Sequence, residues 1–116
     1  MSHDPFSPDR VPVPISKMRI ESVGVNALDR RRVDVAVDLT PCLEPVDVEM
    51  VVVDPNDDEL CSTLLVQNRE WMLDRILHLR RDADAGNHVL HVGVFRKKEL
   101  VTRAMRTFSF PPSEPV

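Results

Sequence analysis

Hydrophobic and polar residues alternate with a period of two along much of the chain. In residues 32–39 every second position is valine or leucine, and the positions between them are charged except for Ala36. Residues 46–53 repeat the alternation before the run becomes apolar on both sides at Val51 and Val53. Such a period puts one set of side chains on a core and the other in water, and β-branched valine suits a pleated surface. The pattern predicts β-strands.

Turn-forming residues separate these segments at short intervals. Residues 26–29 divide the first strand from the second, and Pro41 and Pro45 divide the second from the third. Residues 54–57, Asp-Pro-Asn-Asp, favour a turn, and residues 96–99, Arg-Lys-Lys-Glu, make a polar break before the last apolar segment. Short strands at this spacing predict an all-β fold, an antiparallel β-sandwich of about seven strands.

Residues 68–82 fit two different structures. As a helix, the segment would be capped by Asn68 and would carry Arg80 and Arg81 in its last turn. As a strand, it keeps a period of two that only Arg75 interrupts. We favour a strand, because the neighbouring segments are strands and a glycine-containing turn follows.

Prolines concentrate at both ends of the chain. Residues 1–14 hold four prolines and residues 111–116 hold three, and proline cannot donate a hydrogen bond to a sheet. We therefore expect both ends to be flexible. Residues 15–110 are expected to form one domain, since 116 residues leave no room for a second core of ordinary size.

Residues 84–90, Asp-Ala-Gly-Asn-His-Val-Leu, place a glycine two residues before a large polar-tipped ring. They resemble the Asp-x-Gly-x-Tyr-x-Cys signature at the E–F corner of immunoglobulin domains, and a similar run in bacterial fibronectin type III-like modules. His88 stands in the place of the tyrosine and Leu90 in that of the second cysteine, so the inter-sheet disulfide is absent. The resemblance implies an immunoglobulin-like sandwich in which Gly86 permits the turn and His88 reaches back to the upstream backbone. It implies an architecture and no particular function.

Charge and hydropathy argue against two classes of partner. A net charge of −4 and a pI near 5.5 disfavour nucleic acid, which attracts a concentrated positive field. The longest strongly apolar stretch, residues 50–53, is too short to cross a membrane. Residues 1–8 carry an acid and two prolines and lack the apolar run of a secretion signal, so we expect a cytoplasmic protein.

The sequence contains no motif for catalysis, cofactor binding or a metal. His88 and His91 lie three apart on an expected strand, so their side chains leave opposite faces and cannot close on one ion. Cys42 and Cys61 match no zinc or disulfide framework, and the three glycines form no phosphate-binding loop. We expect a protein that is not an enzyme and holds no cofactor or metal.

The alternation leaves apolar residues on a face that points away from the core. If Leu90, Val92 and Val94 face the core, their neighbours face outward. Together with outer positions of the third and last strands, the expected surface consists of Val51, Val53, Val89, His91, Phe95, Val101 and Met105. Such a patch marks a protein partner or a homodimer interface, unless the N-terminal arm or a loop covers it. The alternative function is binding of a small molecule or carbohydrate, with Trp71 as the stacking residue.

Overall fold

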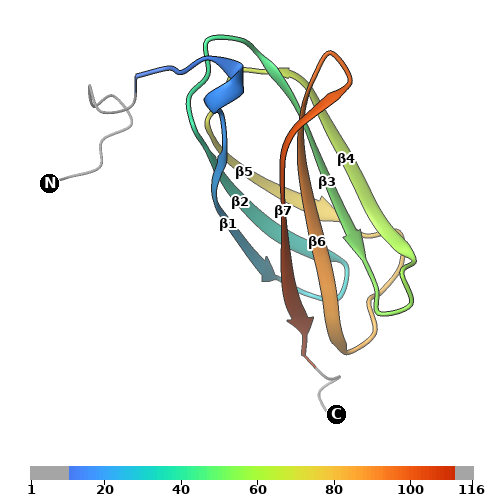
Figure 1. Ribbon diagram of the computed structural model, residues 1–116. Helices are drawn as coiled ribbons and strands as arrows, with labels where there is room; N and C mark the ends of the chain where they lie inside the picture. The colour runs from blue at the N-terminus through green and yellow to red at the C-terminus, as the bar shows by residue number, and fades with distance from the viewer. Residues whose placement is uncertain (1–10, 112–116) are drawn as a thin grey trace, which may run out of the picture.

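The computed structural model describes residues 11–111 and folds them into two antiparallel β-sheets, the two layers of Figure 1. A short 3-10 helix, η1 (Ile15–Lys17), precedes seven strands. The strands are β1 (Ile20–Ala27), β2 (Arg32–Leu39), β3 (Val46–Val53), β4 (Glu59–Asn68), β5 (Met72–His78), β6 (Gly86–Arg96) and β7 (Glu99–Phe110). The predicted all-β sandwich of seven antiparallel strands is confirmed. Within residues 11–111, no helix is long and apolar enough to span a membrane.

The strand order is immunoglobulin-like except for the fourth strand. β1, β2 and β5 form one sheet in that order, and β4, β3, β6 and β7 form the other. A constant-type immunoglobulin domain pairs its fourth strand with its fifth, in the sheet of the first two strands. Here β4 pairs with β3 instead. This widens the sheet that ends in β7 and leaves β5 at the edge of a three-stranded sheet.

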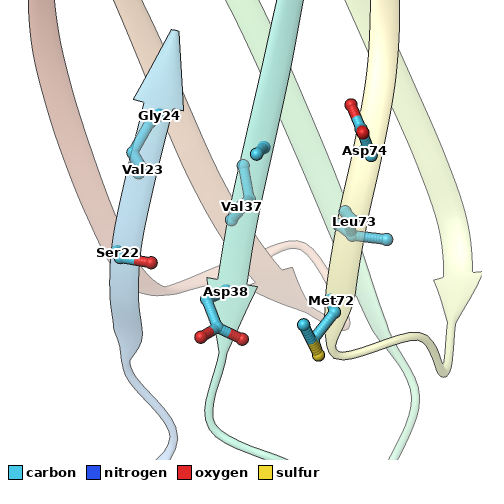
Figure 2. A pocket seen from close by; sticks show the side chains of 9 residues that line it. Ser22, Val23, Gly24, Val37, Asp38, Met72, Leu73 and Asp74 are labelled. Atoms are coloured by element: carbon cyan, nitrogen blue, oxygen red, sulfur yellow. The ribbon is translucent and has the colours of Figure 1, made fainter.

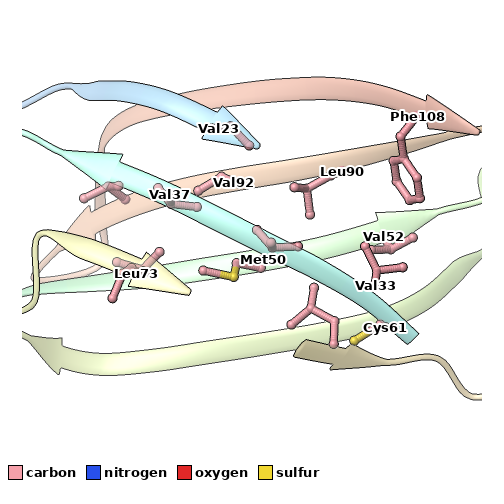
Figure 3. Packing of buried hydrophobic residues seen from close by; sticks show 14 of the residues in the cluster. Val23, Val33, Val37, Met50, Val52, Cys61, Leu73, Leu90, Val92 and Phe108 are labelled. Atoms are coloured by element: carbon pink, nitrogen blue, oxygen red, sulfur yellow. The ribbon is translucent and has the colours of Figure 1, made fainter. Parts of the chain in front are cut away.

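The core lies between the two sheets and consists of every second residue of the strands. All four inward-facing residues of β2 are at most 2% exposed, and they are Val33, Val35, Val37 and Leu39. The opposing sheet buries Val46, Val48, Met50, Val52, Leu90, Val92 and Val94. Figure 3 shows side chains from both sheets meeting in this space. Because successive side chains leave opposite faces, burying this set commits the intervening set to the two outer faces.

The segment that fits both a helix and a strand is a strand, as we favoured. β5 pairs with β2 along its whole length, and Leu73 and Leu77 enter the core. Asn68 caps no helix, because its side chain accepts from the Glu70 backbone N–H at 3.2 Å and donates to the Glu70 carbonyl at 2.7 Å. Arg75, which interrupts the alternation, pairs with the Glu70 carboxylate at 3.0 Å. An inward-facing charge on an edge strand hinders pairing with further strands.

Both ends of the described chain are tied to the sandwich. Val13 donates to the Pro41 carbonyl and accepts from the Leu43 N–H, so the domain begins slightly before the expected boundary at residue 15. The flexibility expected for the rest of the arm and for the tail falls on residues 1–10 and 112–116, which lie outside the described residues. At the seam between the sheets, the Arg106 guanidinium donates to the Val23 carbonyl at 3.1 Å and links β7 to β1.

Candidate functional site

The outer face of the four-stranded sheet brings together most of the predicted surface residues. Val51, His91 and Met105 lie directly opposite one another on β3, β6 and β7. Val53 and Val89 form the next cross-strand pair on the same face. Met105 is 61% exposed and the other four are half-buried. The alternation read from the sequence therefore placed these five side chains on one surface.

Phe95 lies on this face and folds back over its own strand. A Cβ atom at Gly93 would come within 2.9 Å of Phe95 Cε2 and 3.3 Å of its Cζ, so the ring occupies the space that a side chain at 93 would need. Leu100 lies opposite Phe95 on β7, and its Cδ1 would be 3.9 Å from the same position. Gly93 is thus the residue that lets an aromatic ring lie against the sheet.

Val101 does not belong to the surface where we expected it. A register shift between Val94 and Phe95 brings Leu100 opposite Phe95, whereas Val101 packs against the core. Val101 also lines a separate hollow of about 280 Å³ next to Ile15 of η1. The prediction counted strict alternation through β7, and a bulge adds one residue to that count.

β4 adds two residues that the sequence analysis missed. Leu64 and Val66 are 55% and 64% exposed, and Leu64 lies opposite Glu49 of β3. The continuous apolar run of residues 64–66 carries no alternation, so it could not show which side chains face outward. We call the complete surface the apolar face; it consists of Val51, Val53, Leu64, Val66, Val89, His91, Phe95, Leu100 and Met105.

Two opposite charges flank the centre of the apolar face. Glu49 on β3 and Arg103 on β7 both lie opposite Gly93 on β6, one to each side. Adjacent strands are about 4.8 Å apart, which puts the two backbones about 10 Å apart. Neither side chain forms an ion pair with another residue in the range 11–111. A hollow of about 300 Å³ lies between them, over Gly93 and beside Phe95.

The outer face of the three-stranded sheet has a different character. Gly24 and Ala36 are opposite each other and leave a hollow of about 610 Å³. Ser22, Asp38 and Met72 lie at one end of this hollow and Asp74 at the other (Figure 2). We call this surface the acidic face; it consists of Ser22, Gly24, Asn26, Asp34, Ala36, Asp38, Met72, Asp74 and Ile76.

Two carboxyl groups on the acidic face, those of Asp34 and Asp74, influence each other's ionisation. The pKa of Asp34 is raised above its ordinary value of 3.8, first by the hydrogen bond with the Asp74 side chain, then by burial and by the like charge of Asp74. A raised pKa means that the two carboxylates oppose each other when both are ionised. Within residues 11–111, no group of three or more histidine, cysteine or carboxylate side chains is placed to hold a metal ion.

Asp54 begins the turn between β3 and β4 and has the opposite environment. Its Oδ1 accepts from the backbone N–H groups of Asn56 and Asp58 at 2.8 and 2.9 Å, and its Oδ2 lies 2.9 Å from the Arg81 guanidinium. The pKa of Asp54 is lowered, chiefly by the hydrogen bond from Asp58 and further by Arg81. Both oxygens are engaged in holding the turn.

Gly86 and His88 lie at the start of β6, directly after the loop that follows β5. Gly86 has a φ of +117°, a conformation that residues with a side chain rarely adopt. His88 is 1% exposed, and its Nδ1 is 3.1 Å from the Gly86 carbonyl oxygen. Its ring packs edge-on against Phe110 at 4.7 Å and lies 6.0 Å from Phe108. This arrangement is structural, because the histidine is enclosed and its ring packs against the side chains of Phe108 and Phe110.

Other candidate residues are also part of the fold. Trp71 is half-buried and packs against the core, so it offers no open platform for stacking a sugar. Cys42 and Cys61 are buried free thiols, and burial raises the pKa of the Cys61 thiol. A buried thiol with a raised pKa is a poor nucleophile.

Similarity to known proteins is found in the fold and not in the sequence. No protein-family model and no curated protein sequence matches the chain. A glycosyl hydrolase family 2 member from Bacteroides cellulosilyticus aligns with 80% of this chain at a TM-score of 0.61 and 12% identity. A β-glucuronidase of glycoside hydrolase family 2 aligns with 80% at 0.58 and 6% identity, and the Ruminococcus gnavus β-glucuronidase with 81% at 0.55 and 12% identity.

The chain corresponds to a small segment of these proteins. It spans 15%, 12% and 16% of the length of the three chains, respectively. At such low identity the likeness establishes the sandwich fold alone, since this fold carries many unrelated functions.

Proposed function

We propose that the chain is a non-catalytic assembly module of the immunoglobulin-like, fibronectin type III-like type, and that it self-associates through the apolar face. One observation carries the proposal: apolar side chains from all four strands form one surface on the outer side of the four-stranded sheet, interrupted by Asp47, Glu49, Ser62, Arg103 and Thr107. Leu64, Val66, Leu100 and Met105 are each more than half exposed and surround the half-buried centre of this face. Contiguous apolar surface of this kind is typical of protein interfaces.

The contrast between the two outer faces supports a second copy as the partner at the apolar face. Asp34 and Asp74 already oppose each other within one acidic face, and two such faces would repel. The centre of the apolar face carries one positive and one negative side chain, Arg103 and Glu49, and is compatible with its own copy. Closed two-fold dimers are the commonest assemblies of identical chains.

The experiment is sedimentation velocity over a range of concentrations up to about 1 mM, where even weak association is detected. The parent protein is expected to dimerise. Val51→Lys buries a charge in the interface and should yield a monomer with unchanged circular dichroism. Ile76→Lys is the matched control, because Ile76 is 49% exposed on the other face, and it should leave the dimer intact. A parent protein that stays monomeric throughout would refute the proposal.

A second candidate is a carbohydrate-associated module. It is favoured by the occurrence of this fold within glycoside hydrolase family 2 chains. The binding surface would be the hollow over Gly24 and Ala36, whose flanking carboxylates accept hydrogen bonds from sugar hydroxyls and repel anionic sugars. Neutral β-linked glucose oligosaccharides at about 10 mM should then shift the NMR signals of these two residues, and Ala36→Leu should abolish the shift. Unchanged spectra would eliminate this candidate.

A further inference from the structure

We infer that two copies pair about a two-fold axis parallel to β6, so that Glu49 of each copy meets Arg103 of the other. The inference rests on the proposed function and adds the orientation of the two sheets. It follows from the charges at the centre of the apolar face, from the strand order and from the hollow over Gly93.

Glu49 and Arg103 lie in one cross-strand row, with one sign on each side of β6. Asp47, opposite Phe95, is a further charge on this face, and its Oδ1 accepts from the Gln67 backbone N–H at 2.9 Å. Glu49 and Arg103 both lie opposite Gly93, and neither has an ion-pair partner in the described part of the chain. A charge in an apolar surface is costly to desolvate unless a partner compensates it. Burying this face against a second copy therefore requires that each charge finds its opposite there.

Only some orientations satisfy this requirement. Rotation by a half turn about an axis along β6 exchanges the two sides of that strand and preserves positions along it. The copy's β3 then lies over β7, which brings Glu49 to Arg103 twice and Val51 to Met105 twice. An axis across the strands would instead bring Glu49 to Glu49 and Arg103 to Arg103. Both axes give aligned strands, the usual packing of two sheets, so the charges decide between them.

The hollow provides room for the paired side chains. Gly93 has no side chain and lies between Glu49 and Arg103 at the floor of the hollow of about 300 Å³. Under the inferred axis, Gly93 of one copy faces Gly93 of the other. The Phe95 ring lies over each Gly93, so the two rings meet at the centre of the dimer and supply apolar contact. The hollows beside the rings leave space for the Arg103 side chains.

Charge reversal in two separate variants tests the axis. Glu49→Arg gives a copy with two arginines at this row, and Arg103→Glu gives a copy with two glutamates. Each variant alone should dimerise at least about 10-fold more weakly than the parent, because both pairs become repulsive. An equal mixture should form a heterodimer within about 3-fold of the parent affinity, because both pairs are attractive again. Asp74→Arg on the acidic face is the control and should dimerise like the parent.

The outcomes separate this inference from the proposed function. If the parent dimerises and Val51→Lys dissociates it, but the mixture associates no better than either single variant, the axis is wrong and the apolar face is still the interface. If the parent does not dimerise, both fail. Recovery in the mixture, measured by sedimentation with one variant fluorescently labelled, establishes the reciprocal pairing.

Discussion

The two outer faces of this sandwich come from the same sequence pattern and have opposite surface properties. On the three-stranded sheet, the positions between the buried residues are filled by aspartate, asparagine, serine, glycine and alanine, with Met72 and Ile76 at the edge strand. On the four-stranded sheet, the equivalent positions hold valine, leucine, phenylalanine and methionine together with Asp47, Glu49, Ser62, Arg103 and Thr107. A period of two determines that a strand has two faces, but the residue types decide what each face can contact.

The glycine on each face illustrates the same difference. Gly24 is opposite Ala36, and the absence of large side chains there leaves an open hollow. Gly93 is covered by the ring of Phe95, so the equivalent space is filled by an apolar side chain. One face therefore leaves its backbone accessible to solvent between acids, and the other presents an aromatic surface.

Alanine substitutions of the two histidines of β6 should give the largest difference in stability between a buried position and an outer-face position. His88→Ala removes a buried ring from its contacts with Phe108 and Phe110 and the hydrogen bond to the Gly86 carbonyl, and it should cost about 1–3 kcal/mol of unfolding free energy. His91→Ala, on the apolar face, should change this free energy by less than about 0.5 kcal/mol. Chemical denaturation measures both. Equal stability of His88→Ala and the parent would contradict a structural role for the corner.

The two glycines provide a matched pair of smaller effects. Gly93→Ala pushes the Phe95 ring off the sheet and should both weaken dimerisation and lower stability by about 0.5–1 kcal/mol. Gly24→Ala meets only Ala36, at 3.8 Å, and should be neutral or should stabilise by about 0.5 kcal/mol through the unfolded state. Thermal melting and sedimentation of the two variants check this. If both behave alike, Phe95 does not depend on the space over Gly93.

The smallest effects are expected from two aspartates whose pKa values are shifted in opposite directions. The raised pKa of Asp34 means that its repulsion from Asp74 persists at neutral pH and is relieved as the pH falls through that pKa. Asp74→Asn should therefore stabilise slightly near neutral pH, and the gain should vanish toward pH 3.8. Asp54→Asn should destabilise near neutral pH, because its lowered pKa reflects stabilisation that is lost only on acidification.

Carbon-detected NMR titration of the carboxyl groups checks the origin of these shifts. In Asp74→Asn, the pKa of Asp34 should move down toward its ordinary value, while that of Asp54 stays unchanged. An Asp34 pKa that does not respond would show that burial and not Asp74 is its main cause.

The sequence by itself determined the strands and, for most of them, the side that faces the core. Strict alternation in β2 and β3 is compatible with only one choice of the side that faces the core, because a shift by one residue would bury Asp34 and Asp47 and expose valines. The resemblance of residues 84–90 to the E–F corner also predicted a turn at Gly86 and a ring at His88 that packs beside it. For residues 68–82 the period was compatible with a helix or a strand, and the neighbouring strands and the following turn favoured the strand.

The tertiary structure alone decided which strands are neighbours and where alternation shifts. The bulge at β6 and β7 took Val101 off the apolar face, and the pairing of β4 with β3 brought Leu64 and Val66 onto it. The placement of Glu49 and Arg103 on either side of Gly93, and the packing of Phe108 and Phe110 on His88, likewise bring distant segments together. The period of a segment shows which of its side chains lie on each face of the strand. Register and bulges depend on the free energy of pairing with another strand, which no single segment determines.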